Sequence, residues 1–149
     1  MKRLLLNTLK SIPFVALLAF FNPVNAQNIS TSDTLLTPAQ WIEFNENIVE
    51  AIHSDNPGVN EGALRMIIRY GHSLNLDRDT AFNIMRIYRD DDSEATRRMA
   101  VLALGNMEDR WAVEFLDMLA PFEESESIKK TMNDVVAAYW ESHGGNPYR

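Results

Sequence analysis

The sequence predicts an all-α fold, namely a short α-solenoid (a right-handed α-α superhelix) of three helical hairpins. Start and stop signals divide residues 37–142 into six helical segments. None of these segments shows the sustained alternation of apolar and polar residues that is typical of a strand. The apolar positions recur at intervals of 31 to 37 residues. A helical hairpin that recurs at such a spacing is the sequence signature of an α-solenoid.

Residues 1–26 have the three parts of a cleaved export signal. Lys2 and Arg3 form a positively charged start, residues 13–21 form an apolar stretch, and Ala26 ends a cleavage site of small residues. An uncleaved membrane anchor is the alternative, but the uncharged stretch is short for a bilayer span and contains two prolines. The chain has no cysteine, so a lipid-modified cysteine is excluded. We expect a bacterial protein that is periplasmic or secreted, with cleavage after Ala26.

The length and charge of the processed chain limit its class. Cleavage removes 26 of 149 residues, three of them basic and none acidic, so the net charge moves from −7 to −10. This charge opposes binding to nucleic acid and to anionic lipid headgroups, and we expect no stable membrane insertion. We expect a disordered linker over residues 27–36, one helical repeat domain over residues 37–142, and a flexible tail over residues 143–149. Without cysteines, packing alone must stabilise this domain.

Capping signals place the first three helices. The segment Thr37-Pro38-Ala39-Gln40 matches a capping box with proline at the first helical position, where the missing N–H is harmless. Asn56-Pro57 opens the second helix in the same way, and Gly71 marks its end. Asp77 is the expected cap of the third helix, which ends at the Asp90-Asp91-Asp92 run.

The last three helices follow the same rules. Their expected caps are Asp92 or Ser93, Asp109, and Ser125 or Ser127. Their expected ends are Gly105, the region of Pro121, and the residues before Gly144-Gly145. The fourth helix is apolar almost all round from Met99 to Leu104, which indicates a helix packed between neighbours on both sides.

The spacing of apolar positions repeats from hairpin to hairpin. The second helices share the stripe i, i+4, i+7, i+8, i+11, which starts at Val59, Thr96 and Ile128. The first helices share the stripe i, i+3, i+4, i+7, which starts at Phe44, Ala81 and Ala112. The intervals between successive stripe starts in the two sets agree within one residue, as stacked hairpins require. An irregular six-helix globule is the alternative, because all amphipathic helices have similar stripes.

Residues 91–116 resemble the HEAT-repeat pattern. The segment Thr96 to Gly105 is similar to the second helix of such a repeat, which ends in Ala-Leu-Gly. Asp109 with residues 112–116 is similar to the first helix of the following repeat, and Asp91 lies where HEAT-like repeats often carry an aspartate. The resemblance implies an α-solenoid that serves as an interaction surface and not as a catalyst.

The candidates for metal binding or catalysis are weak. His53, His72 and His143 lack the spacing of zinc ligands. Residues 75–86 imitate a calcium-binding loop but lack its glycine and its final glutamate. The run from Asp90 to Asp92 is either a cation site or a group of carboxylates that a helix dipole stabilises, and both interpretations stay open. We expect no cofactor and no catalytic residue; a small hydrolase or metal-binding protein is the remaining alternative.

Two pairs of cations suggest a partner-binding surface. Directly after the first stripe position of the fourth and sixth helices come Arg97, Arg98, Lys129 and Lys130. The second helices of HEAT-like repeats line the concave face, so the resemblance implies a basic ridge there that fits an acidic segment of a protein partner. The alternative is that these cations pair with aspartates such as Asp91, as struts between repeats.

Trp41, Trp111 and Trp140 lie on or beside the apolar stripes, which places them in the core or at the ends of the stack. Trp140 is also a candidate partner contact, because an exposed tryptophan at the end of a stack can anchor a partner. The sequence thus favours an exported, non-catalytic, HEAT-like protein–protein interaction module with an unidentified partner. An accessory or regulatory subunit of an envelope or secreted complex is the alternative.

Overall fold

The computed structural model describes residues 36–146, and within this range it contains six α-helices, two short 3-10 helices and no strand. The elements are α1 Pro38–Ile52, α2 Pro57–Tyr70, η2 Gly71–Ser73, α3 Arg78–Asp90, α4 Glu94–Asn106, α5 Arg110–Leu119, η3 Ala120–Phe122 and α6 Glu126–Ser142. The prediction of an all-α fold with six helices is therefore confirmed. The predicted export signal and nearly all of the predicted linker lie outside the described residues.

Each helix begins where a polar side chain caps its first turn. The caps are Thr37, Asn56, Asp77, Ser93, Asp109 and Ser125. Thr37 and Gln40 form the complete capping box that the sequence predicts. The sequence left two caps open. The cap of α4 is Ser93 and not Asp92, and the cap of α6 is Ser125 and not Ser127. Each cap accepts a hydrogen bond from one or two backbone N–H groups of the first turn, which have no acceptor within the helix. Such a cap stabilises the helix by about 1 kcal/mol.

The prediction that Gly105 ends the fourth helix is wrong. Helix α4 continues to Asn106, and the chain turns at Glu108, whose φ of 55° is in the left-handed region. Gly105 lies where α4 meets α6, and a Cβ atom there would overlap the Val135 side chain. Glycine at this position therefore serves close packing and not helix termination.

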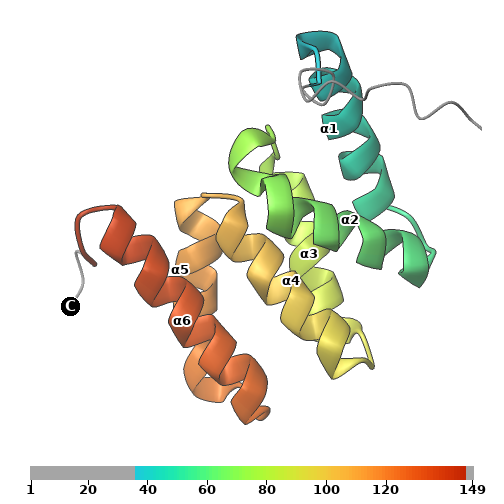
Figure 1. The fold of residues 1–149 in the computed structure, drawn as a ribbon. Helices are drawn as coiled ribbons and strands as arrows, with labels where there is room; N and C mark the ends of the chain where they lie inside the picture. The colour runs from blue at the N-terminus through green and yellow to red at the C-terminus, as the bar shows by residue number, and fades with distance from the viewer. Residues whose placement is uncertain (1–35, 147–149) are drawn as a thin grey trace, which may run out of the picture. The chain divides into compact units, whose positions relative to one another are not determined.

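The helices form two layers, which Figure 1 shows with α4 in the middle of the nearer one. Helix α4 contacts α2 on one side and α6 on the other. Helices α1, α3 and α5 each contact the helix that follows them in the chain, so that α1–α2, α3–α4 and α5–α6 are hairpins. Two glycines permit the close contacts within the α2–α4–α6 layer, because Gly71 abuts the carbonyl of Asn106 just as Gly105 abuts Val135.

Burial follows the predicted stripes most closely in the central hairpin, α3–α4. Four residues of α4 are fully buried, namely Ala100, Val101, Ala103 and Leu104. This burial confirms the prediction of a helix with neighbours on both sides. All four stripe positions of α3 are buried, namely Ala81, Ile84, Met85 and Tyr88.

The first hairpin departs from the stripe that its sequence indicates. Asn47 and Val59 are exposed, whereas Ile52 and Leu64 are fully buried. This hairpin packs against another on one side only, so its burial is centred on the positions that face α3 and α4. No helix within residues 36–146 combines the length and the apolar character that a bilayer span requires.

The close approach of α4 to the end of α2 predicts that Gly71→Ala destabilises the fold by about 1–3 kcal/mol, because the added methyl group overlaps a backbone carbonyl of α4. The matched control is Gly62→Ala inside α2, where a Cβ atom has no neighbour within 4 Å. This control removes a helix-disfavouring glycine and should stabilise the fold by roughly 0.5–1 kcal/mol. Urea unfolding followed by circular dichroism measures both effects. Equal stabilities of the two variants would contradict the packing described above.

Candidate functional site

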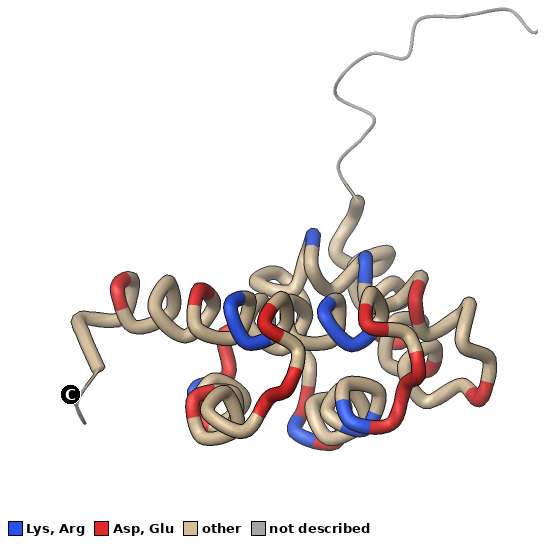
Figure 2. The backbone as a smooth tube through the Cα atoms, turned by 90° about the horizontal axis from the view of Figure 1, so that it is seen from below, with Lys and Arg blue, Asp and Glu red and all other residues tan. Residues whose placement is uncertain are grey.

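The four predicted cations lie in the first turns of two helices that contact each other. Arg97 and Arg98 belong to α4, and Lys129 and Lys130 belong to α6. Figure 2 shows the two basic segments on the helix that leads to the C-terminus and on its neighbour, each with acidic positions close by. We call these four residues the basic ridge. The structure thus brings together the residues that the sequence singled out, but their side chains have different surroundings.

Arg97 points into the protein and not into solvent. Its Nε donates a hydrogen bond to the Tyr88 carbonyl oxygen at 3.0 Å, and its Nη2 donates to both carboxylate oxygens of Glu123 at 3.0 Å. Its guanidinium carbon lies 5.6 Å from the centre of the Tyr88 ring. These contacts hold the Arg97 side chain in one orientation, with 28% of it exposed.

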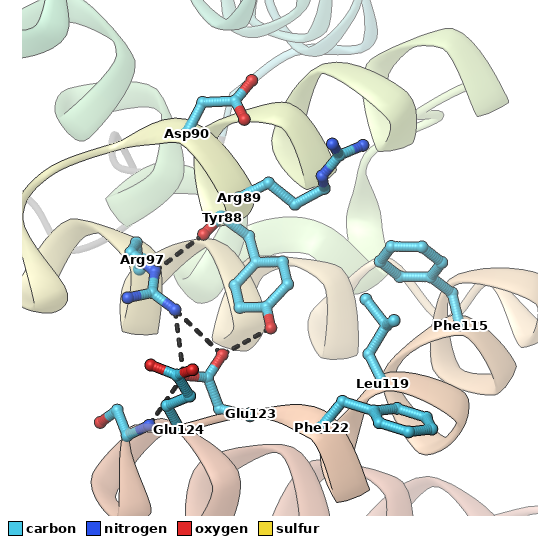
Figure 3. A pocket seen from close by; sticks show the side chains of 10 residues that line it. Tyr88, Arg89, Asp90, Arg97, Phe115, Leu119, Phe122, Glu123 and Glu124 are labelled. Atoms are coloured by element: carbon cyan, nitrogen blue, oxygen red, sulfur yellow. Dashed lines mark hydrogen bonds and ion pairs between the residues drawn. The ribbon is translucent and has the colours of Figure 1, made fainter.

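Glu123 is the centre of this network, because it joins three elements. The Tyr88 hydroxyl at the end of α3 donates to Glu123 Oε2 at 2.6 Å, and the Ser125 N–H before α6 donates to Oε1 at 2.9 Å. With the ion pair to Arg97 of α4, four hydrogen bonds meet on a carboxylate that is only 3% exposed. Figure 3 shows these side chains converging. We call Tyr88, Arg97, Glu123 and Ser125 the Glu123 cluster.

The cluster keeps one negative charge buried at neutral pH. Burial alone would raise the pKa of the Glu123 carboxyl, but the hydrogen bonds from Tyr88 and Ser125 and the charge of Arg97 outweigh burial and hold this pKa below its usual value. Burial, and then the Glu123 carboxylate, raise the pKa of Tyr88 to about 12. Glu123 is therefore an acceptor and Tyr88 a donor throughout the neutral range. Removing one member of such a buried pair typically costs about 3–5 kcal/mol.

The partner of Arg97 is not one of the aspartates that the sequence suggested. Asp91 accepts a hydrogen bond from the Ser93 N–H at 2.8 Å, and thus shapes the turn between α3 and α4. Arg97 instead pairs with a residue 26 positions further along, in the turn before α6. A second contact between the same segments is the hydrogen bond from Ser125 Oγ to Glu94 at 2.8 Å. The α3–α4 and α5–α6 hairpins are therefore linked by polar contacts at one end.

Of the other cations of the basic ridge, Arg98 and Lys130 are exposed, whereas Lys129 is half-buried like Arg97. Lys130 Nζ pairs with Asp134 at 2.6 Å and Lys129 lies 4.0 Å from Glu126, both within α6. Arg98 is exposed and forms no ion pair with any other residue of the range 36–146. Exposed ion pairs contribute little stability, so these cations are available to a partner. Trp140, by contrast, is 8% exposed and offers little surface for contact.

A pocket of about 750 Å³ lies between the carboxyl-terminal ends of α3 and α5. Phe115, Leu119 and Phe122 line one side of it, Arg89 lines another, and the Glu123 cluster lies at its base (Figure 3). We call it the α3–α5 pocket. Sequence reasoning missed both Glu123 and Phe122. The sequence contains one indication of this surface, because Phe122 is an aromatic residue that lies outside every helical stripe and is followed by two glutamates.

Two of the three histidines and the calcium-like segment have structural partners. The Nδ1 atoms of His53 and His143 lie 2.7 and 2.8 Å from carbonyl oxygens one helical turn earlier. Asp77 accepts hydrogen bonds from the hydroxyl and the N–H of Thr80, which lower the Asp77 pKa. Asp77 is thus the helix cap that the sequence predicts. Among residues 36–146, no group of three or more histidines and carboxylates is placed to hold a metal ion.

Comparison of the chain with protein-family models, with curated proteins and with solved structures finds no match. The HEAT resemblance of residues 91–116 therefore rests on the residues themselves. The function has to be argued from the surfaces described above.

The pKa of Glu123 predicts how stability depends on pH. Because this pKa is lower in the folded chain than its usual value of 4.5, the charged network contributes stability above that value and loses it as the pH falls through the lower, folded pKa. Glu123→Gln removes this contribution and this pH dependence together. Urea midpoints of both proteins between neutral and strongly acidic pH should therefore converge as the pH falls. A stability difference that stays constant over the whole range would contradict the assignment.

Proposed function

We propose that this chain is an exported, non-catalytic interaction protein built as a short HEAT-like α-solenoid of three hairpins. The observation that carries the proposal is the repeated packing of the second helices. Helices α2, α4 and α6 contact one another in chain order, and a glycine near the end of α2 and of α4 touches the next second helix. In repeat proteins each unit buries its face against the next and leaves extended surfaces for partners.

The export part of the proposal rests on residues 1–26. Their charged start, apolar stretch and small-residue cleavage site after Ala26 support release into the periplasm or the medium. A processed chain with a net charge of −10 suits a soluble protein partner better than nucleic acid. The chain contains no cysteine, so its fold does not depend on the redox state of that compartment.

The surface that we assign to the partner is the exposed part of the basic ridge. Arg98 and Lys130 are exposed on adjoining helices, with the half-buried Lys129 next to Lys130, and cations at the surface of an acidic protein favour an acidic segment of a partner. Arg97 supports this surface from below through its ion pair with Glu123. Its substitution should therefore act mainly through stability.

An accessory subunit of an envelope or secreted complex is the second candidate. The observation that favours it is the apolar exposure of the first hairpin, where Leu36, Ile42 and Val59 are 40%, 63% and 42% exposed. Apolar side chains at the end of a stack are suited to packing on a larger assembly. Capture that depends on Ile42 and not on Arg98 would favour this second role.

Crosslinking and pull-down from the cell envelope with the processed chain tests the proposal. We predict that wild-type protein captures a protein partner, that capture weakens as salt concentration rises, and that Arg98→Glu reduces it about tenfold. The matched control is Arg86→Glu on α3, an arginine that is also exposed but lies outside the ridge, which should leave capture unchanged. Melting temperatures should stay close to wild type in both. Equal capture by both variants, or turnover of a substrate by the purified protein, would refute the proposal.

A further inference from the structure

An apolar strip of exposed and half-buried side chains follows α5 on the side that faces α3. It consists of Phe82, Trp111, Phe115, Met118 and Phe122. The ring centres of Phe82 and Trp111 lie 4.9 Å apart, and those of Trp111 and Phe115 lie 6.2 Å apart. Phe82, Met118 and Phe122 are 51%, 60% and 79% exposed. Adjoining apolar side chains that stay exposed often mark a protein–protein interface.

The strip ends at the α3–α5 pocket. Phe115 and Phe122 of the strip line the pocket together with Leu119, opposite Arg89 (Figure 3). Phe122 is held at the rim by the short η3 helix, and most of its ring lies in solvent. The surface thus presents both a projecting aromatic ring and a cavity large enough to receive one.

At the pocket end of the strip, two charges of opposite sign, Arg89 and Glu124, lie on opposite sides. Arg78 and Arg89 lie on the α3 edge; the first is 5.4 Å from an indole ring of the strip and the second lines the pocket. On the α5 side, Glu124 lies in the turn that follows the helix, whereas Glu114 is already paired with Arg110 at 2.7 Å within α5. Asp90, at the end of α3, also lines the pocket. Arg89 and Glu124 form no hydrogen bond or ion pair with any residue in the described part of the chain, so both charges are available to a second molecule.

We propose that two copies of this chain form a symmetric dimer through the apolar strip. Helices α3 and α5 run in the same direction, because Arg78 lies beside Trp111 near the start of both, whereas Tyr88 and Leu119 line one pocket near their ends. A two-fold axis parallel to the strip then sets Arg89, at the end of α3 in each copy, against Glu124, in the turn after α5 of the other. An axis across the strip would set like charges together, so the charge pattern selects the first arrangement.

This arrangement makes specific contacts, each of which occurs twice. Arg89 of one copy meets Glu124 of the second copy. Phe122 of each copy enters the α3–α5 pocket of the other, which removes both exposed rings from water. Arg97 lies at the base of this pocket, but Arg98, Lys129 and Lys130 do not line it, so the dimer leaves the surface proposed for partner capture open.

Sedimentation velocity of the purified processed protein, over a wide range of concentrations, tests the dimer. The wild type should show a reversible monomer–dimer equilibrium. Phe122→Ser and Arg89→Glu should each weaken dimerisation about tenfold or more. Combining Arg89→Glu with Glu124→Arg should restore it to within about threefold of wild type, because the ion pair is re-formed with its charges exchanged.

The matched control is Ile42→Ser on α1, another exposed apolar residue, which should leave the equilibrium unchanged. Circular dichroism melts confirm that the variants are folded, as expected for exposed positions. A wild type that stays monomeric at the highest concentrations overturns the inference. So does a dimer that Phe122→Ser and Arg89→Glu leave intact, or one that the exchanged pair fails to restore. None of these outcomes depends on the pull-down result.

Discussion

The close packing of α4 between α2 and α6 is the constraint on which the rest of the structure depends. Small side chains make it possible, since Ala100 and Ala103 are fully buried and Gly71 and Gly105 each abut the next helix of the layer. Helix α4 also packs against α3 and α5, so it contacts elements of all three hairpins. The domain has no disulfide, so this apolar packing supplies most of its stability.

Polar contacts then fix one end of the layers. The Glu123 cluster joins the end of α3, the start of α4 and the turn before α6. It also sets the position of Phe122, which is next in the chain to a glutamate that cannot move without breaking its hydrogen bonds. The same cluster therefore links hairpin packing to both proposed surfaces: Arg97 lies under the basic ridge, and Phe122 projects from the rim of the α3–α5 pocket.

The sequence predicted what depends on neighbouring residues and missed what depends on distant ones. A helix cap needs only residues within one turn, and so Thr37 and Asp77 were recognisable. The role of Gly105 was mistaken because glycine both ends helices and permits close packing, and only the position of Val135 decides between the two. The bond between Tyr88 and Glu123 spans 35 residues, so it follows from the tertiary arrangement and not from any local pattern.

Native-state hydrogen exchange of backbone amides tests the central role of α4 most directly. If α4 is the common packing partner of the three hairpins, the amides of residues 100–104 should exchange only through global unfolding, with the same free energy as urea unfolding. Amides of α1 and of the last turns of α6 should exchange earlier, through local opening. Amides of α4 that exchange faster than those of α1 or α6 would contradict the account.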